Sequence, residues 1–187
     1  MQPELEPFAT RVALETGALE PERQVSERRL GEMAGLYAAP VATSSTILVY
    51  RVSTVPVPER SSDLLCCTTV IEPGLVDDEY FMTAGHYHAM RDRAETYLGL
   101  AGSGLVILAD EAGRWRALPL RAGDLAYIPG GWAHRTVNAG DDQVRFLSTW
   151  IADAGHDYAT IRARGFPVRV VRRAGEPAVV ENAAFRR

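Results

Sequence analysis

The sequence predicts an all-β protein, a sandwich or barrel with one short helix near each end of the chain. Its apolar runs have the length of strands, and Gly, Pro and Asp interrupt them about every eight to twelve residues. Helical periodicity is scarce. The 187 residues suffice for a substantial core, so we expect a single domain over 1–187 whose ends, 1–5 and 183–187, are loose.

The first expected element is a short helix within the segment SERRLGEMAGLY. Leu30, Met33 and Leu36 recur there at a helical interval, and Ser26 is a suitable N-cap residue. Strands are expected wherever β-branched, aromatic and other apolar residues cluster between turn residues. These runs are 46–55, 64–71, 79–84, 94–102, 104–110, 114–120, 123–129, 134–138, 143–151 and 167–173.

A second short helix is expected in DYATIRARGF, where Asp157 opens it and Gly165 ends it. The glycine-rich segment 99–104 has a strand on each side and no helix after it. It is therefore expected to be a hairpin turn rather than a phosphate-binding loop.

Composition excludes several classes of partner. The formal net charge is −4 and no basic stripe interleaved with aromatic residues is present, so no nucleic-acid partner is expected. No apolar run approaches the length of a membrane span, and the first residues do not resemble a signal peptide. The adjacent Cys66 and Cys67 are expected to be buried, reduced thiols, which fits the cytoplasm. An anionic ligand would need local donors or a metal.

Three histidines and a glutamate form the candidate site. His86 and His88 are one residue apart, so on a strand their rings project from the same face, and Glu95 and Tyr97 share a face in the next segment. His134 opens a later strand. If these strands enclose one interior, three imidazoles and a carboxylate converge, a set that suits Zn, Fe, Mn or Ni. Such histidines are otherwise hydrogen-bonded core or surface residues.

A second pattern strengthens the metal interpretation. Gly123-x5-Pro129-x-Gly131-x2-His134-x3-Asn138 places turn residues and a glycine before the histidine. This spacing resembles the second motif of the cupin superfamily. The first stretch resembles the first cupin motif, in which His-x-His is followed by Glu, but six residues rather than three or four separate His88 from Glu95.

The motifs around this longer spacing are similar to those of one particular family. TAGHYHAMRDRAETY, WAHRTVN and ADAGHDYATIRARGF together resemble the cupin-type glucose-6-phosphate isomerases, and the likeness runs from EPFATRVALETG to GFPVRVV. The resemblance implies a cupin double-sheet β-barrel of the jelly-roll type, a homodimer, and a sugar phosphate as the small-molecule partner. The implied reaction is reversible isomerisation of glucose 6-phosphate and fructose 6-phosphate.

The resemblance also implies roles for individual residues. It implies one divalent transition metal per subunit, iron first and otherwise Mn, Ni or Zn, held by His86, His88, Glu95 and His134. It implies phosphate contacts at Tyr50, Thr69, Thr83 and Gly85, with Tyr158 nearby, and places Tyr97 and His156 at the sugar. Ala84 stands where the family often has a lysine. Without the resemblance, Tyr50, Thr69 and Thr83 would be ordinary strand residues, His156 a surface residue, and Trp132 and Trp150 core aromatics.

Catalysis is assigned to Glu95, Tyr97 and His156. Glu95 is the carboxylate of the set and the candidate base, while Tyr97 and His156 would orient hydroxyls or help to open the ring. The alternative is that Glu95 only binds metal and the hydrogen moves as hydride. Two other functions remain open: an isomerase acting on mannose 6-phosphate or on both hexose phosphates, and a non-catalytic sugar-binding cupin.

Overall fold

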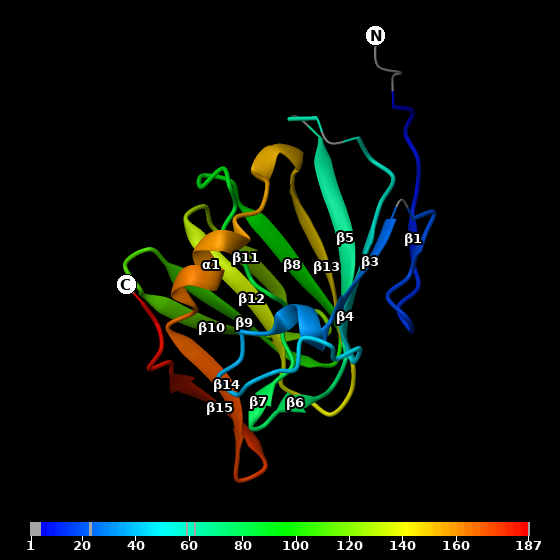
Figure 1. The fold of residues 1–187 in the computed structure, drawn as a ribbon. Helices are drawn as coiled ribbons and strands as arrows, with labels where there is room; N and C mark the ends of the chain where they lie inside the picture. Colours follow the sequence, from blue (N-terminus) through cyan, green and yellow to red (C-terminus); the bar gives the residue numbers. More distant parts are fainter. Residues whose placement is uncertain (1–4, 23, 59, 62, 187) are drawn as a thin grey trace.

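The computed structural model describes residues 5–22, 24–58, 60–61 and 63–186, and it confirms the all-β prediction (Figure 1). The largest sheet has the order β11-β8-β13-β5-β4-β3 and a smaller one the order β10-β9-β12. The strands of the large sheet are β3 (Gln24–Arg29), β4 (Leu48–Thr54), β5 (Leu64–Ile71), β8 (Glu95–Ala101), β11 (Leu125–Ile128) and β13 (Val144–Ile151). Those of the smaller sheet are β9 (Ser103–Asp110), β10 (Trp115–Arg121) and β12 (Trp132–Asn138).

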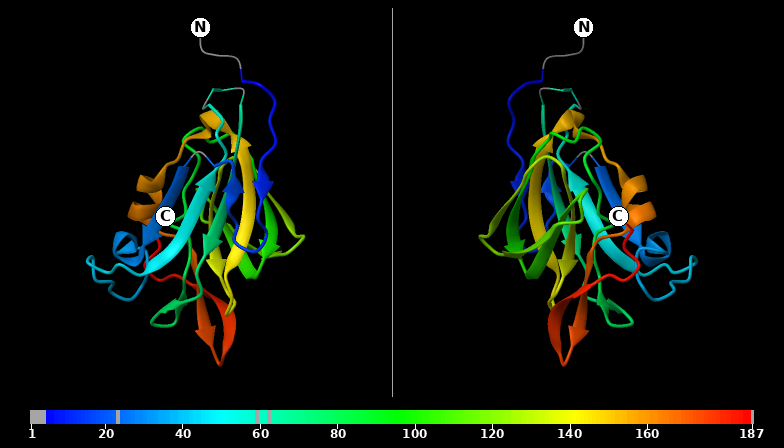
Figure 2. Two further views of the ribbon diagram at one scale, coloured as in Figure 1. Left: turned by 90° about the vertical axis from the view of Figure 1, so that its right-hand side faces the viewer. Right: turned by 90° about the vertical axis from the view of Figure 1, so that its left-hand side faces the viewer.

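Shorter strands complete the architecture. A four-stranded sheet has the order β15-β14-β7-β6, and β1 pairs with β2. These strands are β1 (Arg11–Val12), β2 (Leu19–Glu20), β6 (Leu75–Val76), β7 (Glu79–Tyr80), β14 (Val168–Arg173) and β15 (Glu176–Glu181). The sheets are separate hydrogen-bonded units rather than one closed ring. Their strands converge toward one end of the molecule (Figure 2). No helix in the described part of the chain is long and apolar enough to cross a membrane.

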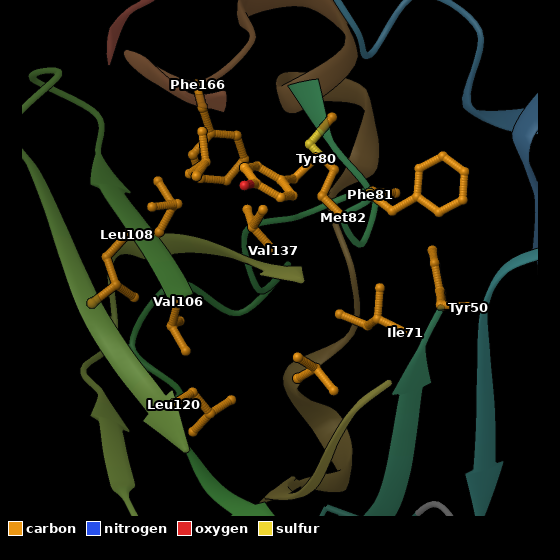
Figure 3. Packing of buried hydrophobic residues seen from close by; sticks show 14 of the residues in the cluster. Tyr50, Ile71, Tyr80, Phe81, Met82, Val106, Leu108, Leu120, Val137 and Phe166 are labelled. Carbon is orange, nitrogen blue, oxygen red and sulfur yellow. The ribbon is translucent and has the colours of Figure 1, made fainter. Parts of the chain in front are cut away.

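The core lies between the large and the small sheet. Val106, Leu108 and Val137 of the small sheet face Ile71 of the large one (Figure 3). On β13 the buried side chains alternate, and Phe146 is 2% exposed. Burial of a side chain of this size contributes roughly 1.5–3 kcal/mol. The same alternation directs every second residue of the large sheet into the interior, which is what places the site residues there.

The strand predictions hold for most of the chain. β5 matches the expected run. The prediction of a hairpin turn at 99–104 was wrong, because β8 and β9 do not pair: β8 belongs to the large sheet and β9 to the small one. Gly102 joins them with a φ of +79°, and a Cβ there would lie 2.3 Å from the carbonyl oxygen of Gln143. In 79–84 only Glu79–Tyr80 is a strand. The strands β1, β2, β3, β6 and β15 were not expected.

The prediction for the N-terminal helix was wrong in most of its length. Ser26 is not an N-cap but lies within β3, opposite Val52, and the helix is a single 3-10 turn, Leu30–Met33. Pairing with β4 supplies the backbone of 24–29 with hydrogen-bond partners, while burial of Leu30 and Met33 accounts for the apolar spacing.

The C-terminal helix is confirmed as α1 (Tyr158–Arg164). The Asp157 carboxylate accepts a hydrogen bond from the Thr160 N–H at 3.0 Å, and Gly165 ends the helix. A further 3-10 turn, η2 (Ala152–Ala154), precedes it. Both cysteines are free, with Cys67 buried and Cys66 only partly buried, on opposite faces of β5. Trp132 and Trp150 are also only partly buried, so neither is a full core residue.

Candidate metal centre

Backbone pairing brings the three histidines together. His86 and His134 exchange hydrogen bonds, from His86 N–H to the His134 carbonyl at 3.2 Å and from His134 N–H to the His86 carbonyl at 3.0 Å. His86 and His88 therefore lie two residues apart on an extended segment beside β12, and both rings reach the same cluster. That segment contains only isolated bridges. Glu95 begins β8 on the facing sheet and is buried with Tyr97, as the period of two predicts.

The four predicted ligands form one cluster. One ligand atom from each of His86, His88, Glu95 and His134 lies within 4.8 Å of all the others. The Glu95 carboxylate is 3.2 Å from His88 Nε2 and 3.0 Å from His134 Nε2. All but His86 are fully buried.

The tautomers of these rings fit a cation. His88 Nδ1 lies 2.9 Å from the Arg93 carbonyl and His134 Nδ1 lies 3.2 Å from the Trp132 carbonyl. A carbonyl only accepts, so in the neutral rings Nδ1 carries the hydrogen and the Nε2 lone pair faces the cluster. Among the described residues, the Nε2 atoms of His86 and His134 are buried without a hydrogen-bond partner. A metal ion would satisfy both lone pairs and the carboxylate together.

Charge states in the cluster follow from burial and neighbours. Burial, with His134, His156 and His88 nearby, holds the pKa of His86 well below its usual value, so its ring is neutral. Burial alone would raise the pKa of Glu95, but the adjacent imidazoles of His134 and His88 outweigh it and lower that pKa. His86 therefore offers a neutral nitrogen and Glu95 an ionised oxygen. Burial alone would lower the pKa of His88, but the adjacent Glu95 carboxylate and the Arg93 carbonyl raise it.

A cavity of about 220 Å³ opens beside the cluster. All the predicted substrate-binding and catalytic residues line it, namely Tyr50, Thr69, Thr83, Gly85, Glu95, Tyr97, His156 and Tyr158. His86 and His134 also line it. His88 does not line it, but it lies 3.2 Å from the Glu95 carboxylate, which does. Trp150 is part of the wall rather than of the core.

The large sheet orders these residues along the cavity. Trp150 pairs with Glu95, and one step along, Ser148 pairs with both Cys67 and Tyr97. The next rows carry Thr69, opposite Val52, and then Tyr50, opposite Arg28. The metal cluster therefore lies toward one end of the cavity floor, and Tyr50 lies several residues away toward the other.

Aromatic side chains line the wall near the cluster. His156 stacks on Tyr158 with ring centroids 5.6 Å apart and planes 7° apart, and its centroid is 4.5 Å from that of His86. Burial and the charge of Glu95 raise the pKa of Tyr97 well above its usual value, and burial raises that of Tyr158 to about 12. Both phenols therefore keep their protons at neutral pH.

Arg28 is the site residue that the sequence did not reveal. It lines the cavity, contacts the Tyr50 hydroxyl and forms a 3.0 Å ion pair with Glu32. Of the described residues that line the cavity, it alone carries a permanent positive charge. The segment around it has a helical apolar pattern, and only assignment to a strand would have placed Ser26, Arg28 and Tyr50 on one face.

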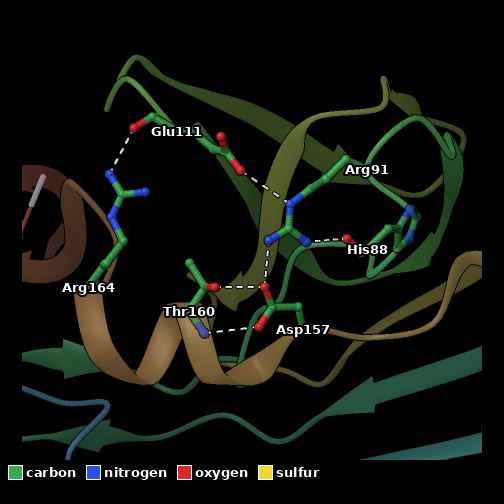
Figure 4. A network of polar contacts seen from close by, with 6 residues as sticks. All are labelled: His88, Arg91, Glu111, Asp157, Thr160 and Arg164. Atoms are coloured by element: carbon green, nitrogen blue, oxygen red, sulfur yellow. Dashed lines mark hydrogen bonds and ion pairs between the residues drawn. The ribbon is translucent and has the colours of Figure 1, made fainter.

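An ionic network holds α1 against the His-x-His segment (Figure 4). Arg91 donates to the Asp157 carboxylate at 2.5 Å, to the Glu111 carboxylate at 3.3 Å and to the His88 carbonyl. The same Asp157 carboxylate accepts from the Thr160 hydroxyl at 2.7 Å. Arg91 thus links a predicted ligand to the residue between His156 and Tyr158, so the network positions both sides of the cavity.

Asp157→Asn is expected to lower kcat/KM by about twofold to fivefold. The amide can still cap α1 but loses the charge that holds Arg91, and a partly exposed pair of this kind contributes at most about 1 kcal/mol. Asp63→Asn is the matched control, because the Arg60–Asp63 pair has 37% and 20% exposed side chains, against 36% and 22% for Arg91–Asp157. Equal losses in the two variants, in steady-state kinetics with metal content measured, would contradict a positioning role.

Comparison with known proteins shows which family this chain matches. A family model described as glucose-6-phosphate isomerase matches residues 27–184. The glucose-6-phosphate isomerase of Pyrococcus horikoshii is 41% identical over 182 residues, covering 95% of this chain and 96% of that protein. The Pyrococcus furiosus protein of the same name is 41% identical and covers 97% of this chain and 98% of its own. A Sinorhizobium medicae protein of that name is 41% identical over 89% of this chain and 81% of its own length.

Proposed function

Because this chain belongs to the cupin-type glucose-6-phosphate isomerase family, we propose that it uses a bound metal to interconvert glucose 6-phosphate and fructose 6-phosphate. The relatives cover nearly its whole length, and the chain is an isomerase of their class. The observation that supports the proposed site best is that the ligand cluster and every other predicted site residue meet at one cavity.

The proposed ligands are His86, His88, Glu95 and His134, which would hold one divalent transition metal per chain. Iron is our proposal for its identity, with Mn, Ni and Zn as alternatives. When bound, such an ion supplies a Lewis acid that polarises the sugar carbonyl.

Isomerisation moves one hydrogen between C1 and C2 of the open-chain sugar. We assign the proton transfer to Glu95, because its carboxylate is ionised and lines the cavity. Tyr97 keeps its proton and would donate a hydrogen bond to a sugar oxygen. His156, stacked on Tyr158 beside the cluster, would orient hydroxyls or help to open the ring.

The phosphate would lie away from the cluster, toward Tyr50 and Thr69. Arg28 supplies a permanent positive charge there, and a guanidinium is well suited to a phosphate dianion. Thr83, Tyr158 and the backbone N–H of Gly85 are the other proposed donors. Gly85 has a φ of +74°, and a Cβ there would lie 2.7 Å from the ring of Phe166. Only glycine therefore lets the backbone pass this close to Phe166.

Thr69→Val is expected to lower kcat/KM for the sugar phosphate roughly tenfold to more than a hundredfold. It keeps the shape of the side chain and deletes one hydrogen bond to a charged group, which is worth about 1.5–3 kcal/mol. Thr83→Val should act similarly, but the Thr83 hydroxyl also accepts from the Thr136 N–H at 3.0 Å, so it will cost stability as well. Metal content should not change in either variant.

Thr96→Val is the matched control for Thr69→Val. Thr96 lies on β8 between the inward-facing Glu95 and Tyr97, so its side chain is on the other face of the sheet. Unchanged kinetics in both Thr69→Val and Thr83→Val would move the phosphate pocket elsewhere.

A coupled assay tests the proposed reaction. Fructose 6-phosphate is supplied, and formation of glucose 6-phosphate and of mannose 6-phosphate is read separately. Glucose 6-phosphate as the main product supports the proposal, whereas mannose 6-phosphate, or both, indicates the alternative isomerase. Binding without turnover of a metal-loaded sample indicates a sugar-binding cupin.

We further propose that the chain forms one domain, works as a homodimer and is cytoplasmic, acting on a small molecule without a nucleic-acid or membrane partner. The dimer is what the sequence resemblance implies, and sedimentation analysis of purified protein tests it. A monomer at micromolar concentration would contradict the homodimer.

A further inference from the structure

A second cavity, of about 490 Å³, lies against α1 and the residues near the C-terminus. The two cavities share no lining residue, and the backbone of Gly85 separates them. Gly85 itself lines the first cavity, while a Cβ placed on it would meet Phe166 and Arg135, which line the second. The second cavity is therefore a distinct space rather than an extension of the catalytic one.

The wall of this cavity is strongly basic. Among the described residues, no acidic side chain lines it, whereas five arginines do: Arg135, Arg162, Arg164, Arg169 and Arg186. Arg169 approaches the buried Glu79 carboxylate at 3.6 Å. Arg164 donates to the Glu111 and Arg186 carbonyls, and Arg162 to the Glu32 carbonyl, so these bonds leave their charges uncompensated.

Four of the five guanidinium groups, all but that of Arg169, have no carboxylate within 4 Å in the described part of the chain. This concentration of charge is unusual in a protein whose net charge is −4. The cavity wall therefore has an excess of positive charge that could attract an anion.

Arg135 is the most telling of the group. It is 5% exposed and packs over the Phe166 ring at 4.3 Å, and one of its terminal nitrogens donates to the Ala84 carbonyl at 2.7 Å. Its Nε is buried with no hydrogen-bond partner among the described residues. Burial lowers its pKa to about 10, and the Glu79 carboxylate offsets that shift only in part.

We propose that this cavity is a second ligand site, which binds a small polyanion carrying two phosphate groups. Planar guanidinium groups bind phosphate oxygens in pairs, and four guanidinium groups without an ion pair can bind two phosphates. The volume is within the range of small-molecule sites, about 300–1,000 Å³, and exceeds that of the catalytic cavity. A sugar bisphosphate and a nucleoside diphosphate share this chemistry.

The test is isothermal titration with inorganic pyrophosphate on metal-loaded protein, with metal content measured before and after. The cavity variant is Arg162→Gln with Arg186→Gln, because both side chains are exposed and neither forms an ion pair in the described structure. The control is Arg116→Gln with Arg121→Gln, which removes the same charge from two exposed positions of β10. We expect one pyrophosphate per chain, binding at least tenfold more weakly in the cavity variant and within twofold of wild type in the control.

Two results would overturn the proposal. One is absent binding, or equal weakening in both arginine variants, which indicates at most general electrostatics. The other is binding that Thr69→Val abolishes and the cavity variant retains, which places it in the catalytic cavity. Fructose 1,6-bisphosphate and ADP are then titrated, and tighter binding of either than of pyrophosphate supports the site and identifies the source. Because the readout is binding, its failure is distinct from failure of the proposed isomerase reaction.

Discussion

Replacing both His88 and His134 by alanine is expected to reduce bound transition metal from about one ion per chain to almost none, and to abolish isomerisation. Each ring supplies one of four donors that lie within 4.8 Å of one another. Loss of an outer hydrogen-bond partner of a metal ligand already costs about 10–100-fold in metal affinity or activity, so loss of a ligand should cost more than about 100-fold. Elemental analysis after dialysis against a weak chelator measures the result.

His156→Ala is the control for these variants. The His156 ring is close to His86, at 4.5 Å between centroids, but it is not one of the four clustered ligands. This variant should keep its metal while losing activity, because it removes a group at the sugar and not a donor. Stoichiometric metal in the His88→Ala/His134→Ala double variant would rule out the assigned centre.

The ligand cluster was predictable because its signal is local. His86 and His88 need only an extended backbone to face the same way, and no regular strand is required for that. Glu95 and Tyr97 follow the same period on β8. What spacing alone does not contain is the pairing of His86 with His134 across 48 positions; family resemblance supplied that step, and the structure agrees.

Other parts of the site depend on contacts between distant segments. Arg28 reaches the cavity because 24–29 pairs with β4, and that tertiary pairing overrides a helical spacing of Leu30 and Met33. Arg91 and Asp157 are 66 residues apart, and no pattern connects them. The arginines of the second cavity come from β12, α1, β14 and the chain end, so their shared wall exists only in the folded chain.

Glu95→Gln is expected to lower kcat by about 10²–10⁴-fold while changing sugar-phosphate binding far less. The substitution keeps size and shape, removes the charge, and deletes the carboxylate that would take a proton from one carbon and return it to the other. Glu95 is 6% exposed with its pKa lowered, so the wild-type group is ready to accept that proton. Metal content must be measured in parallel, because Glu95 is also a proposed ligand.

Isotope transfer separates the two mechanisms for the wild-type enzyme. If Glu95 carries the hydrogen through an enediol, the proton it holds can exchange with solvent, and product formed in D2O should contain some deuterium at the carbon that receives it. A direct hydride shift between C1 and C2 instead transfers the substrate hydrogen intact. Mass spectrometry or proton NMR of the product measures the difference. Complete retention of substrate hydrogen, together with a Glu95→Gln variant that keeps its metal and most of its turnover, would show that the carboxylate only binds the metal.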